Sequence, residues 1–135
     1  MKMEKGLRRL RDYSAVWLVG SAGYSLLEIL WRGFTHWTMA VTGGLCFFLL
    51  YRLNLRRPRE GVLRKCLRGT FAVTAVEFLV GCVVNRLLKW QVWDYSGRFG
   101  NLLGQVCPLY TGLWFLLCIP VYGLAGLVRK LLARM

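Results

Sequence analysis

Four long apolar runs constrain this 135-residue chain more than any other feature. They cover residues 13–31, 37–53, 70–88 and 102–128, and each is close to the ~20 residues that an α-helix needs to cross a hydrocarbon core of ~30 Å. Hydrophobic residues make up 56% of the chain, more than the ~45–50% typical of soluble domains. We therefore predict an all-α fold, an integral membrane four-helix bundle that forms a single domain over residues 1–135.

The basic residues orient the predicted spans. Most of the 19 Lys and Arg residues precede the first apolar run, separate the second run from the third, or follow the fourth. The positive-inside rule places these blocks in the cytoplasm. Both termini and the basic loop 52–68 are then cytoplasmic, and the loop 89–101 is outside. The aromatic residues typical of a membrane interface gather near that outer side: Trp31, Trp37, Trp90, Trp93 and Tyr95.

Several function classes are disfavoured by the sequence. The net charge of +13 does not indicate a nucleic-acid partner, because the basic residues lie in short blocks between apolar runs. The five cysteines are widely spaced and there is one histidine, so we expect no metal site and no cofactor. No nucleotide-binding or hydrolase motif is present, and the chain is not expected to be an enzyme.

Glu77 is the polar residue that fits lipid least well. It lies about seven residues into the third run, roughly 10 Å deep at ~1.5 Å per residue. A charge at that depth is costly, and such residues usually face the interior of a bundle. Thr70, Thr74, Gly81 and Asn85 recur at helical spacing on the same face. Glu77 is either a hydrogen-bonded link between helices or a working binding or proton-handling site.

The first half of the chain repeats this pattern, so that the two halves form similar helical hairpins. Glu28 matches Glu77, although Arg32 four residues later offers an ordinary intrahelical ion pair. His36 is a candidate proton handler or a hydrogen-bonded surface residue. Polar side chains from all four runs concentrate towards the outer side, which predicts an outward-facing vestibule. Its expected members are Ser25, Glu28, Thr38, Thr42, Glu77, Asn85, Asn101 and Gln105.

The outer loop has the sequence preferences of a turn followed by a helix. Asp94 and Gly97 occupy the first and fourth positions favoured in a type I turn. Asn101 is a candidate N-cap for the fourth span. Pro108 and Pro120 are expected to kink that span.

Five segments resemble the ABC-transporter type IV permease family, the CmpB-like group of small bacterial membrane proteins. They are residues 32–39, 43–46, 77–81, 93–96 and 104–105, and the resemblance covers about residues 15–125. It implies a multi-pass protein of the bacterial cytoplasmic membrane. It also implies that ATP hydrolysis comes from a separate subunit. The family motifs fall on Glu77 and on Trp93, Asp94, Tyr95 and Ser96.

We predict a transport component with a polar cavity around Glu77. The alternatives are a non-transporting structural or regulatory subunit, and an enzyme that modifies lipid headgroups. Membrane lipids and either further copies of the chain or other membrane subunits are the expected partners. The candidate substrate-binding residues are Glu77, Asn85, Glu28, Arg32, His36, Gln105, Asn101, Trp93, Asp94, Tyr95 and Ser96.

The charge pattern gives a direct test of orientation. Cysteine introduced at Ser96 should react with a membrane-impermeant thiol reagent in whole cells, above the labelling of the parent chain. Cysteine introduced at Glu60 should react only after the membrane is permeabilised, because the positive-inside rule places it in the cytoplasm. The reverse pattern would overturn the orientation and with it the outward-facing vestibule.

Overall fold

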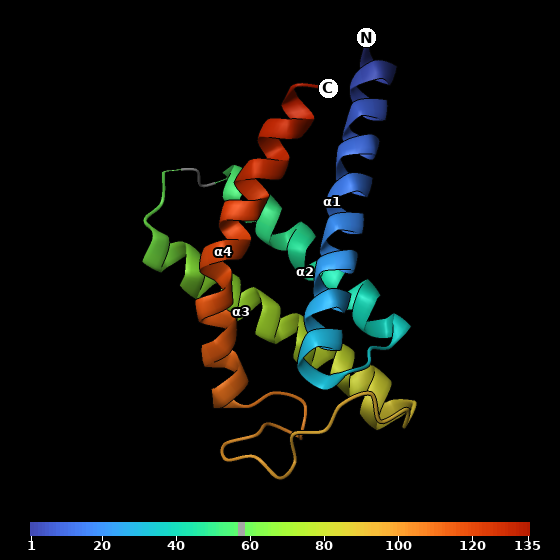
Figure 1. Ribbon diagram of the computed structural model, residues 1–135, viewed down its shortest axis with the longest axis vertical. Coiled ribbons are helices and arrows are strands. Elements are labelled where there is room, and N and C mark those ends of the chain that lie inside the picture. The colour runs from blue at the N-terminus through green and yellow to red at the C-terminus, as the bar shows by residue number, and fades with distance from the viewer. Residues whose placement is uncertain (57–58) are drawn as a thin grey trace. The chain divides into compact units, whose positions relative to one another are not determined.

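The computed structural model describes residues 1–56 and 59–135. Arg57 and Pro58, part of the predicted basic loop 52–68, lie outside the described residues. The helices of the described part are α1 (Lys2–Arg32), α2 (Trp37–Arg56), α3 (Val62–Gly81), a π-helix η1 (Cys82–Leu87) and α4 (Pro108–Ala133) (Figure 1). Four segments of this part are long and apolar enough to cross a membrane, with η1 continuing α3 to Leu87. The predicted all-α class is confirmed.

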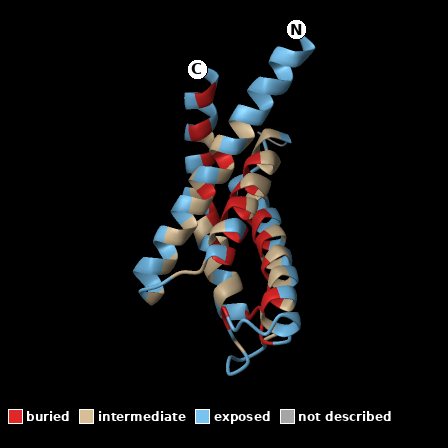
Figure 2. Ribbon diagram, turned by 90° about the vertical axis from the view of Figure 1, so that its right-hand side faces the viewer, coloured by how far each residue is buried: buried red, intermediate tan, exposed pale blue. Residues whose placement is uncertain are grey.

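Helix α1 is longer than the apolar run that predicted it. It starts at Lys2 and continues through the basic N-terminal block to Arg32. At ~1.5 Å per residue its 31 residues extend about 46 Å, well beyond a hydrocarbon core of ~30 Å. The helix ends at Gly33, which adopts a left-handed conformation with φ of 82°, as glycine does without a Cβ penalty. Its first turns are exposed (Figure 2).

Helix α4 begins later than predicted. The run expected to be helical from Leu102 becomes helical at Pro108, and residues 102–106 instead close a tight loop through a bridge between Leu102 and Val106. The prediction that Asn101 is the N-cap of this helix is therefore wrong. Pro108 does not kink the helix either, because it occupies the first helical position, where a missing N–H costs nothing. Pro120 does lie inside α4.

The chain divides into two compact units, which are described separately. Unit 1 comprises residues 1–56 and 122–135, and unit 2 comprises residues 57–121. Unit 1 contains α1, α2 and the last part of α4. Unit 2 contains α3, η1, the loop of residues 88–107, which we call the outer loop after its predicted side, and the first part of α4. The single domain expected from the sequence stays a prediction.

Glycines bring α1 and α2 close together in unit 1. An added Cβ at Gly43 would collide with the side chain of Tyr24, and one at Gly20 would collide with Phe47. A Cβ at Gly44 would lie 2.6 Å from both Ser21 Oγ and Trp17 Nε1. Small residues allow this approach, which membrane helices use in place of hydrophobic association.

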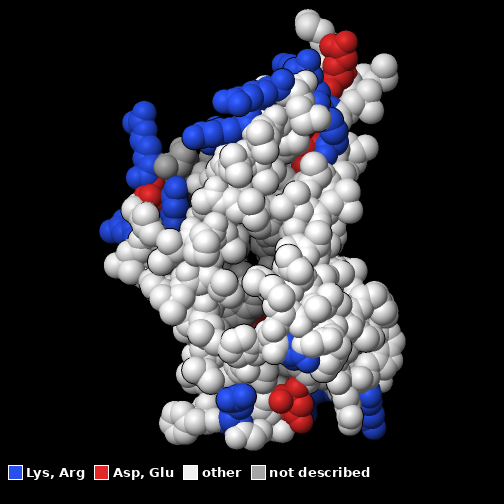
Figure 3. Space-filling view, viewed as in Figure 1, with Lys and Arg blue, Asp and Glu red and all other residues white. Residues whose placement is uncertain are grey.

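Basic residues gather at one end of unit 1. Arg52, near the end of α2, donates to the hydroxyl of Tyr13 on α1 at 2.8 Å, so these two basic helix segments lie together. The N- and C-termini, both in unit 1, lie at the same end (Figures 1 and 2). Lys and Arg side chains crowd the N-terminal part of α1 there (Figure 3). The basic ends of α1 and α2 therefore lie together in unit 1, and the cytoplasmic side expected for them stays a prediction.

The α1–α2 contact predicts unequal effects of two glycine substitutions. Gly43→Ala should destabilise the protein by about 1–3 kcal/mol, because the new methyl group overpacks a tight contact. Gly23→Ala is the matched control, since nothing lies within 4 Å of a Cβ at Gly23. Unfolding in detergent, followed by circular dichroism, measures both. Equal stability of the two variants would contradict the close packing described here.

Candidate functional site

The carboxylate of Glu77 is held inside unit 2. Glu77 lies in α3 and is only 6% exposed. Its Oε1 accepts a hydrogen bond from the Tyr95 hydroxyl at 3.3 Å, and its Oε2 accepts one from Trp114 Nε1 at 3.1 Å. Both donors are neutral groups. The residue therefore faces protein, as the cost of a carboxylate in lipid requires.

A second polar group lies one turn earlier on the same helix. The Oγ1 of Thr74 is buried and has no hydrogen-bond partner within the described part of the chain. Positions three apart on an α-helix are neighbours on one face, so Thr74 and Glu77 share a face of α3. Buried polar atoms without partners are uncommon in folded proteins. The neighbourhood of Glu77 therefore retains an unused hydrogen-bonding group.

Asn85 connects the end of α3 to the outer loop. Its Nδ2 donates to Gln105 Oε1 at 2.8 Å, and its Oδ1 accepts from the backbone N–H groups of Val92 at 2.7 Å and Trp93 at 3.3 Å. Gln105 Nε2 donates to the carbonyl of Leu103 at 2.8 Å, and the Trp93 indole donates to the carbonyl of Gln105 at 3.0 Å. We refer to Asn85, Trp93 and Gln105 as the latch.

The latch depends on a local departure from α-helical geometry and on a glycine. Asn85 lies in the π-helix η1, which closes with the bond from Leu88 N to Val83 O; beyond it, Trp90 N donates to Val84 O. π-Helical turns occur frequently at functional sites. A Cβ at Gly81 would lie 2.5 Å from Gln105 Oε1 and 2.9 Å from Trp93 Cζ2. The sequence pattern did not predict the π-helix.

Strained backbone follows η1. Lys89 and Gln91 have positive φ values of 58° and 51°, a conformation that side chains other than glycine rarely adopt. Such strain persists only where surrounding structure holds it. The bonds that Asn85 accepts from Val92 and Trp93 begin directly after this segment and supply that restraint.

The segment after Trp93 is a compact turn with its own internal bonds. Asp94 Oδ1 accepts from Ser96 N at 2.9 Å, and Arg98 N donates to Tyr95 O at 2.9 Å, so the turn spans residues 95–98 rather than the predicted 94–97. The hydrogen bonds from the backbone and side chain of Ser96 lower the pKa of the Asp94 carboxyl. Asp94 and Ser96 are exposed and act on each other.

Asn101 braces the same loop. Its Nδ2 donates to the carbonyls of Ser96 at 3.0 Å and Arg98 at 2.8 Å, and its Oδ1 accepts from Gly104 N at 2.9 Å. Gly104 has a φ of 73°, and its carbonyl accepts from Tyr95 N at 2.7 Å. Asn101 therefore stabilises the loop that presents Tyr95 to Glu77.

An aromatic series leads from exposed loop residues to the buried carboxylate. The Arg98 guanidinium lies 5.2 Å from the centre of the Tyr110 ring, and Tyr110 stacks on Tyr95 with a centroid distance of 4.7 Å. Tyr95 then donates to Glu77. Arg98 is exposed, both tyrosines are half-buried and Glu77 is buried. The sequence analysis did not select Tyr110 and Trp114, although their spacing of four residues places them on one helical face.

The remaining candidate residues belong to unit 1. Glu28 Oε2 and Arg32 Nε form the i,i+4 ion pair at 2.6 Å, and Arg32 also lies over the Phe34 ring at 4.5 Å. His36 Nδ1 lies 2.6 Å from Thr38 Oγ1 and accepts from Thr38 N at 3.3 Å, at the start of α2. Glu28 and His36 therefore each interact with a residue close to them in the sequence. The single vestibule lined by all four spans stays a prediction.

Comparison with known families identifies the chain. The family described as "Putative ABC-transporter type IV", the CmpB-like group, matches residues 17–135. Because the match covers most of the chain, the protein belongs to this family, as its motifs suggested. Together with the four apolar helices, this makes it a membrane protein. No curated protein and no solved structure matches the chain.

The latch gives a test of how the outer loop is held. Asn85→Ala should lower stability by about 1–3 kcal/mol, because backbone donors and the Gln105 amide lose a buried partner. It should also raise iodide quenching of Trp93, isolated by subtracting the signal of Trp93→Phe. Asn85→Asp keeps the acceptor and should show a smaller change. An Asn85→Ala variant with unchanged Trp93 quenching would show that the latch does not hold the loop.

Proposed function

We propose that this member of the ABC-transporter type IV family is a transport component of the bacterial cytoplasmic membrane. Its binding site is a polar cavity around Glu77 that is reached from outside. The observation that carries the proposal is the buried Glu77 carboxylate, whose two oxygens accept hydrogen bonds from the neutral groups of Tyr95 and Trp114. Those bonds orient the carboxylate, but they add no positive charge. A buried carboxylate of this kind favours binding of a proton or a cation, because either one offsets its desolvation cost.

The donors to Glu77 come from different elements, which gives the site a means of opening. Trp114 is part of α4, whereas Tyr95 belongs to the outer loop that the latch holds. Release of the loop would withdraw the Tyr95 hydroxyl and leave Trp114 in place. Loop motions of this kind admit and release ligands in many proteins. We propose that the stack of Arg98, Tyr110 and Tyr95 forms the outer approach to Glu77.

Other subunits complete the transporter in this proposal. The sequence contains no P-loop motif, so ATP hydrolysis would come from a separate ATPase subunit. Four helices of this length leave little room for a translocation path within a single copy of the chain. Further copies of the chain or other membrane subunits would then line the path with it.

A structural or regulatory subunit is the second candidate, and one observation favours it. Both Glu77 oxygens and both polar atoms of the Asn85 side chain already have protein partners. Such satisfied polar groups can link membrane helices without binding anything else. The lipid-headgroup enzyme gains no comparable support, since Asp94 is engaged with Ser96 and His36 with Thr38.

Charge displacement distinguishes the two candidates. In proteoliposomes on a solid-supported membrane, steps in pH, Na⁺ or K⁺ should produce a transient current in the parent protein. Glu77→Gln should remove at least about nine tenths of it, because an amide carries no charge to neutralise. Glu60→Gln, which alters a loop carboxylate bonded to Arg68, is the matched control and should keep the current.

The Gln variant must fold for this comparison, and its thermal unfolding in detergent checks that. Folding is expected, because an amide oxygen accepts the hydrogen bond of Tyr95 or Trp114 as a carboxylate does. If folded Glu77→Gln gives the full current, Glu77 is a structural link and the transport proposal fails. Absence of current in the parent protein under every step would also favour the structural subunit.

A further inference from the structure

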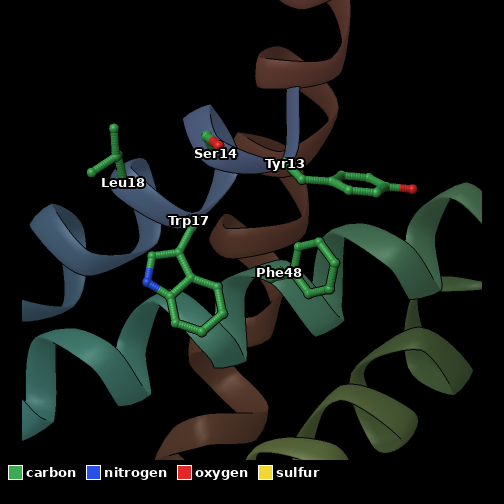
Figure 4. Close-up of a pocket in the computed structure, with 5 residues that line it drawn as sticks. All are labelled: Tyr13, Ser14, Trp17, Leu18 and Phe48. Atoms are coloured by element: carbon green, nitrogen blue, oxygen red, sulfur yellow. The ribbon is translucent and has the colours of Figure 1, made fainter. Parts of the chain in front are cut away.

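An open groove lies between α1 and α2, entirely within unit 1. Its lining residues are Tyr13, Ser14, Trp17, Leu18 and Phe48 (Figure 4). The Phe48 ring meets Tyr13 edge-on with centroids 5.1 Å apart, and Trp17 with centroids 6.4 Å apart. The groove has a volume of about 500 Å³, within the ~300–1,000 Å³ typical of ligand pockets. It is separate from the Glu77 site, so the inference does not depend on the proposed function.

One end of the groove is cationic. Arg52 lies 5.6 Å from the centre of the Tyr13 ring and donates to its hydroxyl through Nη1. Within the described chain this is its one hydrogen bond, which leaves Nε and Nη2 as donors. Arg9 is exposed and lies one turn before Tyr13 on the same face of α1. The Ser14 hydroxyl is exposed at the rim.

The position along α1 gives the groove an orientation in the bilayer. Tyr13 begins the first apolar run, and the helix before it is basic. The cationic end therefore falls at headgroup level, where Tyr, Trp and Arg are favoured. Trp17 and Leu18 follow about one turn further along α1, towards the acyl chains, and the Phe48 ring lies beside both Tyr13 and Trp17. The groove is thus cationic at the end near the headgroups and apolar towards the acyl chains, which matches the order of polar and apolar parts in a phospholipid.

We propose that this groove binds one anionic phospholipid. Arg52 and Arg9 hold its phosphate, with the Ser14 hydroxyl as an additional donor, and an acyl chain lies against Trp17, Leu18 and Phe48. Guanidinium groups suit phosphate because they donate two parallel hydrogen bonds. An anionic headgroup is favoured over a zwitterionic one because the latter carries a cation that two arginines would repel. The bound lipid would fix the depth of the α1–α2 pair in the cytoplasmic leaflet.

Tryptophan quenching tests the groove directly. Phosphatidylglycerol with brominated acyl chains should quench Trp17 in the full-length protein in nanodiscs, and the Trp17→Phe variant isolates that signal. Unlabelled phosphatidylglycerol should compete, whereas phosphatidylcholine and inorganic phosphate should not. Arg52→Gln should weaken binding at least about fivefold, since it removes the charge-assisted hydrogen bonds of the guanidinium to the phosphate. Arg56→Gln, one turn further along α2, is the matched control and should leave binding unchanged.

Three results would overturn the proposal. They are no quenching of Trp17 by the brominated lipid, equal binding of phosphatidylglycerol and phosphatidylcholine, and equal effects of Arg52→Gln and Arg56→Gln. If Arg52→Gln does not fold, Arg9→Gln gives the same readout from an exposed position and should also weaken binding severalfold. An unchanged affinity in that variant would show that Arg9 does not hold the phosphate, and the proposed headgroup site would be wrong.

Discussion

The architecture of unit 2 follows from one constraint, which is that the carboxylate of Glu77 cannot lie in lipid. Helix α3 is apolar enough to span a bilayer, yet it carries this group well inside its length. The carboxylate must therefore face polar donors from the protein. Tyr95 and Trp114 provide them from the outer loop and from α4. The loop is consequently part of the packing of unit 2, because its Tyr95 hydroxyl donates one of the hydrogen bonds that the carboxylate accepts.

A loop that must deliver one hydroxyl accurately needs its own restraints, and these explain most of the polar residues around it. Asn85 fixes where the loop leaves the helix, Gln105 fixes where it returns, and Trp93 links them. The π-helical turn and the positive φ values of Lys89 and Gln91 are unfavourable backbone conformations, and they occur at the same place. Gly81 and Gly104 supply the room that a side chain would remove. The strain lies beside the candidate site, where it can influence how the loop moves.

Hydropathy predicted the helices well because lipid leaves a spanning backbone few alternatives. It failed at residues 102–107, which are as apolar as a span. There Gly100, Leu103 and Gly104 adopt positive φ, so that the helix cannot include them, and α4 begins at Pro108. Glu77 and Asn85 could be selected from sequence, since polar residues within apolar runs are conspicuous. Tyr110 and Trp114 could not, because an aromatic residue in an apolar run looks the same whether it meets lipid or a carboxylate.

The two halves of the chain treat their membrane acids differently, and this bears on which half does chemistry. Glu28 is paired within its own helix with Arg32, so its charge is offset by an adjacent cation. Glu77 receives neutral donors instead, and one of them belongs to a loop. An acid that is already paired with a cation has little to gain from binding another, and the Tyr95 and Trp114 donors to Glu77 are neutral. If one half binds a cation or proton, the half that contains Glu77 is the better suited. In the α1–α2 half, by contrast, glycines bring the two helices close together and Arg52 bonds to Tyr13 at the basic end.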